Sequence, residues 1–281
     1  MSTRRMQTAL GEAHFDHGAQ YFTVRDEGFR ERVEAWIAEG VVAPWPAAGS
    51  DAYVGVPAMN SPVRRMAQGF DVRWSTLVTK VESAVPGWRL FVEGGDVFDV
   101  DMAVIAAPAE QTAALLATAT PDLASRAGAA TSQPCWTVML AFSAPVAVVR
   151  DCWRGEDVIG WAARNSAKPG RSGPETWVAQ ATPDWSRRCL EAAPDWVAAT
   201  LTAALSNTLG VALPDSVGIV SHRWRFARSA ADGSGAILDH DRRLGVCGDW
   251  LIGPRVEAAW VSGASLAQRV GVYASGGRPT I

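Results

Sequence analysis

The sequence predicts a mixed α/β fold in which antiparallel strands dominate and one strand–helix unit belongs to a parallel sheet. Three observations support this prediction. Residues 71–107 contain short apolar runs separated by Pro-Gly and Gly-Gly turns, which is typical of an antiparallel meander. Residues 102–107 form a continuous apolar run followed by a helical segment, which indicates a strand buried on both faces. Residues 25–40 and 195–209 carry apolar side chains at helical spacing.

Composition bounds the classes of protein to which the chain can belong. It has 281 residues, of which 48% are hydrophobic and 20% charged, and its net charge is −3. These values are typical of a globular protein with one large domain or two interleaved ones. A chain of this charge offers no electrostatic reason to expect a nucleic-acid partner. No apolar run approaches the roughly 20 residues that span a bilayer, and no signal peptide is recognisable, so we expect a cytoplasmic protein without a membrane partner.

The four cysteines are far apart in the sequence. They show no CxxC spacing and no association with histidine, so we expect reduced thiols and no metal site. Cys135 and Cys247 fall within apolar strands, where a structural role is favoured.

The N-terminal quarter combines irregular chain with short elements. Residues 1–24 are expected to be irregular or extended, and Phe29 opens the apolar stripe of a helix that ends near Gly40. A strand pair is expected at 41–45 and 53–56. Asn60 then either caps a short helix that runs to Gly69, which we favour, or contacts substrate.

The rest of the chain alternates strands and helices. After the meander, in which Val72 and Trp74 form the first strand, a helix is expected to Leu116. Further strands are expected at 136–142, 159–164, 176–181, 217–224 and 244–247, and helices at 185–191, 195–209 and 256–270. In the helix at 195–209, the predicted buried stripe contains Trp196, Leu201 and Leu205.

The segment from Leu244 to Val270 carries the strongest chemical signal. A strand ends at Gly248-Asp249, and a glycine-containing loop then leads into a helix rich in small residues. A carboxylate at a strand end can accept hydrogen bonds from sugar hydroxyls, and the N–H groups of a helix's first turn stabilise negative charge. The alternative is that Asp249 is only a cap or turn residue of a strand–turn–helix unit.

This segment resembles the C-terminal flavin motif of the FAD-dependent amine oxidase superfamily, and other stretches resemble its bacterial renalase branch. These stretches are STRR at 2–5, FDHGAQYFTVRD at 15–26, YVGVPAMNSPVRRMAQG at 53–69, PCWTVMLAF at 134–142, NSAKPGR at 165–171, ETWVAQATPDWS at 175–186 and HRWRFA at 222–227. They occur in the order of the family and cover essentially the whole chain.

The resemblance implies a hydroxybenzoate-hydroxylase-like, FAD/NAD(P)-binding fold of two interleaved domains, the substrate domain being built on an antiparallel sheet. Residues 1–24, 70–125 and 236–281 would form the FAD-binding domain. Residues 25–69 and 126–235 would form the substrate domain.

The resemblance also implies roles for individual residues. Gly248 and Asp249 would hold the ribityl chain of FAD, Val256 with the adjoining Arg255 would meet the flavin pyrimidine edge, and Val78 would meet the adenine. Arg4 and the loop at 16–20, with Gly18 and Gln20, would line the cofactor. His222, Trp224 and Asn60 are the expected catalytic residues of the substrate pocket.

Several residues have two interpretations at this stage. His17 is either a flavin-loop residue or a structural histidine, and His222 and Trp224 either form a pocket wall or pack in the core. Lys168 and Arg171 either attract a dinucleotide phosphate or belong to a solvated loop, and we favour the solvated loop. Among the 13 tryptophans, core positions are expected for Trp36, Trp196 and Trp260, and strand positions where a nicotinamide-like ring could stack for Trp136, Trp161, Trp177 and Trp224. Strand alternation allows only some of the latter to face one pocket.

The chain departs from the family pattern at its start. Family members begin with a strand, a GxGxxG turn and a helix before the STRR-like segment, whereas no GxGxxG occurs in this sequence. The comparison therefore predicts that the N-terminal unit is missing, either because the start is assigned to an internal methionine or because the chain is truncated, and that this chain binds FAD weakly or not at all.

Three functions follow from these patterns. The first is FAD-dependent oxidation of dihydro isomers of NAD(P)H to NAD(P)+, with oxygen reduced to hydrogen peroxide. The second is general flavin-dependent amine oxidation, and the third is a truncated, FAD-free fragment without catalytic activity. The expected partner is a small-molecule substrate, which for the first function is a dihydronicotinamide dinucleotide, and the sequence does not indicate an oligomeric state.

Overall fold

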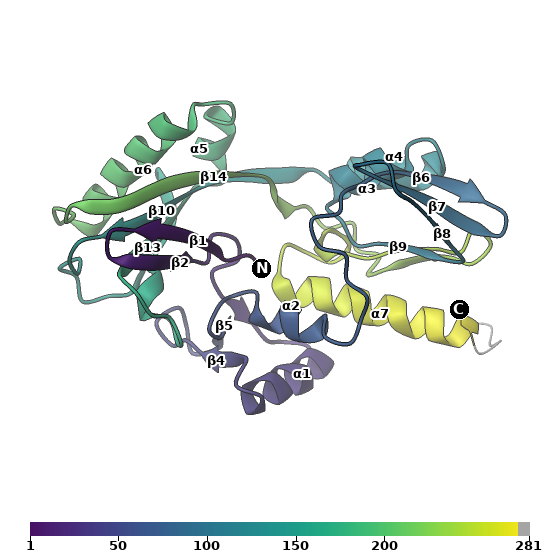
Figure 1. Cartoon of the computed structure of the whole chain (residues 1–281), viewed down its shortest axis with the longest axis horizontal. Coiled ribbons are helices and arrows are strands. Elements are labelled where there is room, and N and C mark those ends of the chain that lie inside the picture. The colour runs from purple at the N-terminus through teal and green to yellow at the C-terminus, as the bar shows by residue number, and fades with distance from the viewer. Residues whose placement is uncertain (275–281) are drawn as a thin grey trace. The chain divides into compact units, whose positions relative to one another are not determined.

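The computed structural model describes residues 1–274, which divide into two compact units (Figure 1). Unit 1 contains Met1–Gln68 and Gln133–Ala227, and unit 2 contains Gly69–Ser132 and the chain from Arg228 onward. The units are therefore interleaved in sequence. Residues 1–24, which were expected to join the FAD-binding segments, belong by packing to unit 1, because their hairpin covers the sheet of that unit.

Unit 1 is built on a five-stranded sheet with the order β11-β12-β13-β10-β14. Its strands are β10 (Ser132–Phe142), β11 (Cys152–Arg154), β12 (Ile159–Arg164), β13 (Glu175–Ala181) and β14 (Ser216–Ser229). β13 pairs antiparallel with both β10 and β12, which places Leu140 opposite Trp177. The strands predicted in this region are confirmed.

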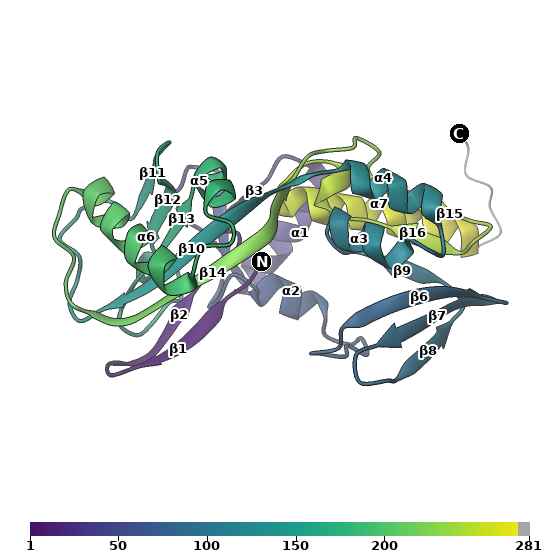
Figure 2. The ribbon, with the colours of Figure 1, turned by 90° about the horizontal axis from the view of Figure 1, so that it is seen from above.

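Successive side chains of β10 point to opposite faces of this sheet, and both faces are buried. Val138 and Leu140 pack with Leu201 of α6 (Pro194–Leu209), whereas Met139 packs with Phe15 of the N-terminal hairpin. Helices α5 (Pro183–Arg188) and α6 cover one face and the hairpin lies on the other (Figure 2). The near-continuous apolar sequence of β10 follows from this double burial.

The N-terminal hairpin was not predicted. Residues 1–24 form β1 (Arg4–Thr8), β2 (Gly11–Phe15) and β3 (Phe22–Thr23), where an irregular or extended segment was expected. β1 and β2 pair through a turn in which Gly11 has a φ of +105°, a conformation that glycine adopts readily. β1 carries few apolar residues, so its periodicity gave little signal.

The rest of the N-terminal region agrees with prediction. The elements are α1 (Glu27–Ala38), β4 (Val42–Pro44), β5 (Ala52–Gly55) and the short α2 (Ser61–Met66). Asp26 caps α1 by accepting a hydrogen bond from the Phe29 N–H, at 2.8 Å. The predicted strand pair is confirmed as β4 and β5, which pair antiparallel.

Unit 2 contains two three-stranded sheets and three helices. The antiparallel meander is β6 (Val78–Ala84), β7 (Gly87–Val92) and β8 (Val97–Val100); the second sheet has the order β15-β16-β9, with β9 (Ala103–Ile105), β15 (Ile237–Asp239) and β16 (Leu244–Val246). The helices are α3 (Ala109–Leu116), α4 (Pro121–Ala129) and α7 (Val256–Ala274), and a 3-10 turn spans Asp249–Leu251. β16 runs parallel to β9, so this sheet contains the parallel pair of the unit.

Two predictions in unit 2 are wrong. The strand at 102–107 was expected to be buried on both faces, but Val104 is 51% exposed, because only alternate side chains of β9 face the core. Val72 and Trp74 were expected in a strand, but they precede β6 and are exposed.

Helix α7 packs closely on the second sheet at Gly245. A Cβ atom at this position would lie 2.9 Å from Leu266 Cδ2 and 3.2 Å from a methyl group of Val104. The absence of a side chain at residue 245 therefore sets the distance between α7 and β16.

The predicted core position of Trp196 is also wrong. Trp196 is 52% exposed and stacks on Trp185, with 6.1 Å between the ring centroids. The buried stripe of α6 contains Leu201 and Leu205, as predicted, but its first member is Val197 and not the preceding Trp196.

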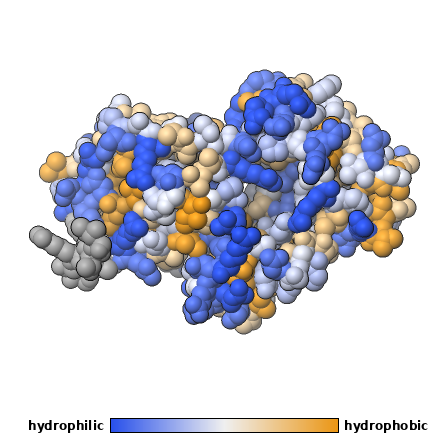
Figure 3. Space-filling view, turned by 180° about the vertical axis from the view of Figure 1, so that it is seen from behind, coloured by the Kyte–Doolittle hydropathy of each residue, from blue (hydrophilic) through white to orange (hydrophobic). Residues whose placement is uncertain are grey.

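On the face in Figure 3, hydrophobic patches are interspersed among hydrophilic residues. Among the described residues, no helix is both long and apolar enough to cross a membrane.

Replacement of Leu201 by alanine tests the core between α6 and the sheet. Leu201 is fully buried, so we expect Leu201→Ala to lower the free energy of unfolding by about 2–5 kcal/mol. Asn207→Ala, at an exposed position of the same helix, should change it by less than about 0.5 kcal/mol. Urea unfolding of the three proteins gives the comparison, and equal effects of the two substitutions would contradict the assigned packing.

Candidate functional site

Three charged side chains form a fully buried ion cluster in unit 1. Asp16 Oδ2 lies 2.5 Å from a terminal nitrogen of Arg171 and 3.2 Å from Lys168 Nζ. Asp16 Oδ1 accepts hydrogen bonds from Thr3 Oγ1, at 2.8 Å, and from the Met59 N–H, at 3.0 Å. The carboxylate therefore joins four segments that are remote in sequence.

Opposing effects set the protonation of this cluster. Burial raises the pKa of Asp16, but Lys168 and Arg171 outweigh burial and bring this pKa down to about 2. Burial lowers the pKa of Lys168 to about 8, against the opposing attraction of Asp16. At neutral pH the cluster holds two cations and one anion.

Both sequence-based interpretations of Lys168 and Arg171 are wrong. Neither residue belongs to a solvated loop, because the Lys168 side chain is fully buried and that of Arg171 is 2% exposed. Neither is free to attract a phosphate directly, because both bind Asp16. One feature of the sequence could have indicated this cluster, since Asp16 is the single acidic residue of the loop at 16–20. Its partners, however, lie about 150 residues away in the chain.

The cluster also fixes the loop at residues 16–20. Gln20 donates through its amide nitrogen to the carbonyls of Asp16 and Gly18, and its amide oxygen accepts from Lys168 Nζ at 3.2 Å. Asn165 accepts from the Asp16 N–H and donates to the His14 carbonyl, at 3.2 and 2.9 Å. The side chain of Gln20, predicted to line the cofactor, is thus engaged in protein contacts.

Beside this loop, His17, His222 and Trp224 form an aromatic cluster. The ring centroid of His17 lies 5.0 Å from that of His222 and 5.1 Å from that of Trp224, and the rings of His222 and Trp224 are 4.4 Å apart. Trp224 Nε1 donates to the His17 carbonyl at 2.9 Å. Two of the three predicted catalytic residues therefore meet the predicted cofactor loop.

Both histidines are held in the neutral form at physiological pH. Burial, reinforced by His222 and Arg4, lowers the pKa of His17 to about 4. Burial and Arg4 also lower the pKa of His222. Arg4, predicted to line the cofactor, thus contributes positive charge near these rings.

Gly18 lies against Trp224. A Cβ atom at Gly18 would be 3.7 Å from Trp224 Cζ2 and 3.5 Å from the Ser2 nitrogen, so the backbone packs close to the indole. The Gly18 carbonyl accepts a hydrogen bond from Gln180 Nε2 at 2.9 Å. Sequence reasoning did not single out Gln180, although it is a polar residue within the otherwise buried β13.

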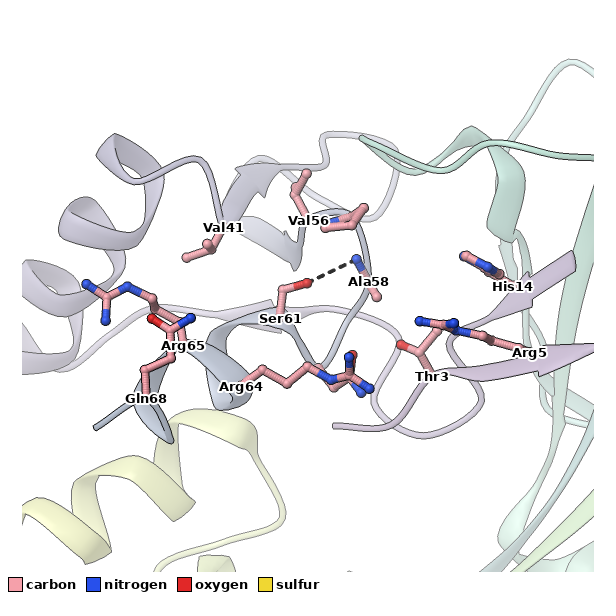
Figure 4. Close-up of a pocket in the computed structure, with 12 residues that line it drawn as sticks. Thr3, Arg5, His14, Val41, Val56, Ala58, Ser61, Arg64, Arg65 and Gln68 are labelled. Atoms are coloured by element: carbon pink, nitrogen blue, oxygen red, sulfur yellow. Dashed lines mark hydrogen bonds between the residues drawn. The ribbon is translucent and has the colours of Figure 1, made fainter. Parts of the chain in front are cut away.

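The third predicted catalytic residue, Asn60, lies elsewhere in unit 1. It precedes α2 but makes no side-chain capping bond, so the favoured capping role is wrong. Asn60 lines a cavity of about 300 Å³ together with Thr3, Arg5, His14, Ser61 and Arg64 (Figure 4). The lining of the cavity combines apolar side chains with three arginines, so the cavity is basic.

The remaining predicted cofactor-binding residues lie in unit 2. Gly248 and Asp249 follow β16, and Val256 begins α7 directly after Arg255. Burial raises the pKa of the Asp249 carboxyl, and hydrogen bonds from nearby backbone N–H groups oppose this shift. Val78 opens β6 and packs against the hydrophobic core of the unit.

Most strand tryptophans proposed for ring stacking are core residues. Trp136 and Trp177 belong to the core beneath α6. Trp161 is 7% exposed and contacts Tyr21, with 5.3 Å between the ring centroids. Of the four, Trp224 is the one that contacts the loop at 16–20 through both its ring and its Nε1.

Solved oxidase structures share this fold. Cyclohexylamine oxidase from Brevibacterium oxydans IH-35A is similar with a TM-score of 0.62 and 14% identity, covering 81% of this chain and 55% of that one. Putrescine oxidase bound to putrescine is similar with a TM-score of 0.59 and 14% identity, covering 78% and 54%. The chain spans about half the length of these structures, and at such identity the similarity concerns the fold.

The family follows from the sequence match. Residues 25–271 match the family of flavin-containing amine oxidoreductases. Because this match covers most of the chain, the protein belongs to that family, which confirms the predicted superfamily.

Removal of the Asp16 charge tests the ion cluster. Asp16→Asn would leave Lys168 and Arg171 buried without a counter-charge, so we expect the free energy of unfolding to fall by about 3–5 kcal/mol. Asp184→Asn, which breaks an exposed pair with Arg187, should cost less than about 1 kcal/mol. Chemical denaturation at neutral pH measures both, and similar losses would argue against the cluster.

The low pKa of His17 predicts a pH-dependent stability. Between pH 6.5 and about 4 the unfolded chain binds a proton at this residue and the folded chain does not, so stability falls as the pH falls. We expect His17→Gln to reduce the loss of unfolding free energy between pH 7.5 and pH 4.5 by about 2–3 kcal/mol. An unchanged loss in denaturation curves at the two pH values would contradict the burial of a neutral imidazole.

Proposed function

We propose that the chain acts as an FAD-dependent oxidoreductase of the renalase-like kind, which oxidises dihydro isomers of NAD(P)H to NAD(P)+ with oxygen as the acceptor. The observation that carries this proposal is the positive, carboxylate-poor environment of the aromatic cluster. Arg4 acts electrostatically on His17 and His222, and the adjoining ion cluster has one more cation than anions. Such a site favours a phosphate-bearing dinucleotide over a protonated amine.

The aromatic cluster suits a planar, uncharged ring. Trp224 is half-buried and offers a flat surface beside a loop that is held in place by buried hydrogen bonds, while the buried imidazole of His17 stacks on the indole and supports it. Hydride loss from a dihydropyridine is driven by aromatisation and needs orientation and exclusion of water more than a protein base. The low pKa values of the histidines are consistent with a positioning role.

The residues of unit 2 fit a flavin cofactor. Asp249, which follows Gly248 at the end of β16, provides a partly buried carboxylate. Within the described part of the chain, this carboxylate forms no ion pair. After the 3-10 turn and a short loop, the first turn of α7 supplies N–H groups that have no acceptor within the helix. In this proposal Asp249 accepts hydrogen bonds from ribityl hydroxyls, and the N–H of Val256 meets the flavin pyrimidine edge.

The bound flavin would supply hydride acceptance and the subsequent transfer of electrons to oxygen. The protein residues would orient the substrate: Trp224 and His17 contact the ring, and Gly18 allows its close approach. Arg255, 43% exposed beside the first turn of α7, would add positive charge there.

Amine oxidation is the second candidate. It is favoured by the fold shared with putrescine oxidase and cyclohexylamine oxidase. An amine substrate would lose hydride to an imine at the same cofactor, so substrate preference distinguishes the two functions.

Anaerobic flavin reduction tests the proposal. The protein is first titrated with FAD, with quenching of flavin fluorescence as the readout, and then mixed with 2- or 6-dihydro-NAD(P) or with primary amines. We expect bleaching of the oxidised flavin by the dihydro isomers and not by the amines. Absence of FAD binding would refute the cofactor assignment and favour the FAD-free fragment without catalytic activity, and faster reduction by amines would favour the second candidate.

The role of Trp224 has its own test. Trp224→Leu removes the indole that contacts His17 and Gly18, so we expect flavin reduction by dihydro isomers to slow about 10-fold or more. Trp196→Leu, at an exposed tryptophan of α6, is the matched control and should leave the rate unchanged. Equal rates in the wild type and both variants would remove Trp224 from the site.

A further inference from the structure

The geometry points to the cavity beside α2 as a binding site for a diphosphate group. The inference that this diphosphate belongs to a nicotinamide dinucleotide rests on the proposed function. The preference of the cavity for a diphosphate rests on the cavity alone. The cavity has a volume of about 300 Å³, within the range of small-ligand sites, and its lining contains three arginines and no carboxylate.

Arg5 and Arg64 are the two cations available to a ligand. Arg64 extends from α2 toward Thr3 and Arg5, while Arg65 and Gln68 lie at the opposite end of the cavity (Figure 4). Arg65 binds Glu39 at 2.6 Å, so its charge is compensated. Within residues 1–271, no ion pair or side-chain hydrogen bond is formed by Arg5 or Arg64.

Neutral donors lie between these cations. Ser61 Oγ accepts a hydrogen bond from the Ala58 N–H at 3.2 Å, so its own hydrogen remains available to a ligand. The Asn60 amide is not used in capping the helix. His14 also lines the cavity, and its Nε2 lies 2.6 Å from Glu12 Oε1, which offsets any positive charge on that ring.

The buried ion cluster holds the wall of the cavity. Arg171 donates to the Gly55 carbonyl at 2.6 Å, and Asp16 accepts from the Met59 N–H at 3.0 Å. The intervening residues 56–58 line the cavity. The wall is thus fixed before a ligand arrives, and the excess cation of the cluster adds to the positive potential.

This arrangement selects a particular ligand chemistry. A guanidinium matches the oxygens of a phosphate with two parallel hydrogen bonds, and two guanidiniums from separate elements suit two linked phosphates. Arg5 comes from β1 and Arg64 from α2. The diphosphate could belong to the dinucleotide substrate or to FAD itself, since both carry this group.

Binding of inorganic pyrophosphate tests the site without turnover. Isothermal titration of the full chain should show saturable binding that persists at constant ionic strength. We expect Arg64→Gln and Arg5→Gln each to weaken it about 10-fold or more. Arg32→Gln, at an exposed arginine of α1, is the matched control and should leave the affinity unchanged. Thermal unfolding of each variant identifies losses caused by misfolding.

Each outcome bears on the proposal. Absence of pyrophosphate binding, or equal affinity in the wild type and the Arg64→Gln and Arg5→Gln variants, would overturn it. If pyrophosphate and NAD+ compete for the Arg64-dependent site while saturating FAD does not displace them, the diphosphate belongs to the substrate. If FAD displaces pyrophosphate, the site holds the cofactor, and the dinucleotide assignment is overturned. Because no flavin reduction is measured, this result is independent of the test of the proposed function.

Discussion

The buried ion cluster of Asp16, Lys168 and Arg171 is the interaction on which unit 1 depends. One carboxylate, fully removed from solvent, accepts hydrogen bonds from three other segments of the chain. Charges so deeply buried are tolerated only when they are paired and hydrogen-bonded, so these segments must reach their native arrangement together. The loop at 16–20 and the wall of the basic cavity are both positioned by this requirement.

The same cluster relates structure to function. The ion cluster contains two cations and one anion, so it carries an excess positive charge. Asp16 connects it to the basic cavity through Thr3 and to the aromatic cluster through the adjacent His17. Burial and the charge of Arg4 keep His17 and His222 neutral, whereas Asp16 acts in the opposite direction on the pKa of His17. Substrate preference would then follow from the electrostatics of the loop and not from one acid–base residue.

Regular elements were predictable where a segment has a clear apolar period. The helix around Phe29 and the strands of the central sheet follow such periods, because burial of one face depends on local spacing. The hairpin formed by residues 4–15 was missed, since its strands are stabilised by pairing and by packing on Met139. Trp196 was misplaced because spacing alone does not determine which of two adjacent faces of a helix meets the sheet.

The sequence by itself determined most of the helices and strands with a clear apolar period, the family and the flavin-like motif at Gly248-Asp249, since these depend on local patterns of residues. Only the tertiary structure decided that Lys168 and Arg171 are buried partners of Asp16, or that Asn60 lines a cavity shared with Arg64. The physical reason is that a charge is solvated, paired or available to a ligand according to its neighbours in space. Those neighbours lie up to about 150 residues away in the chain.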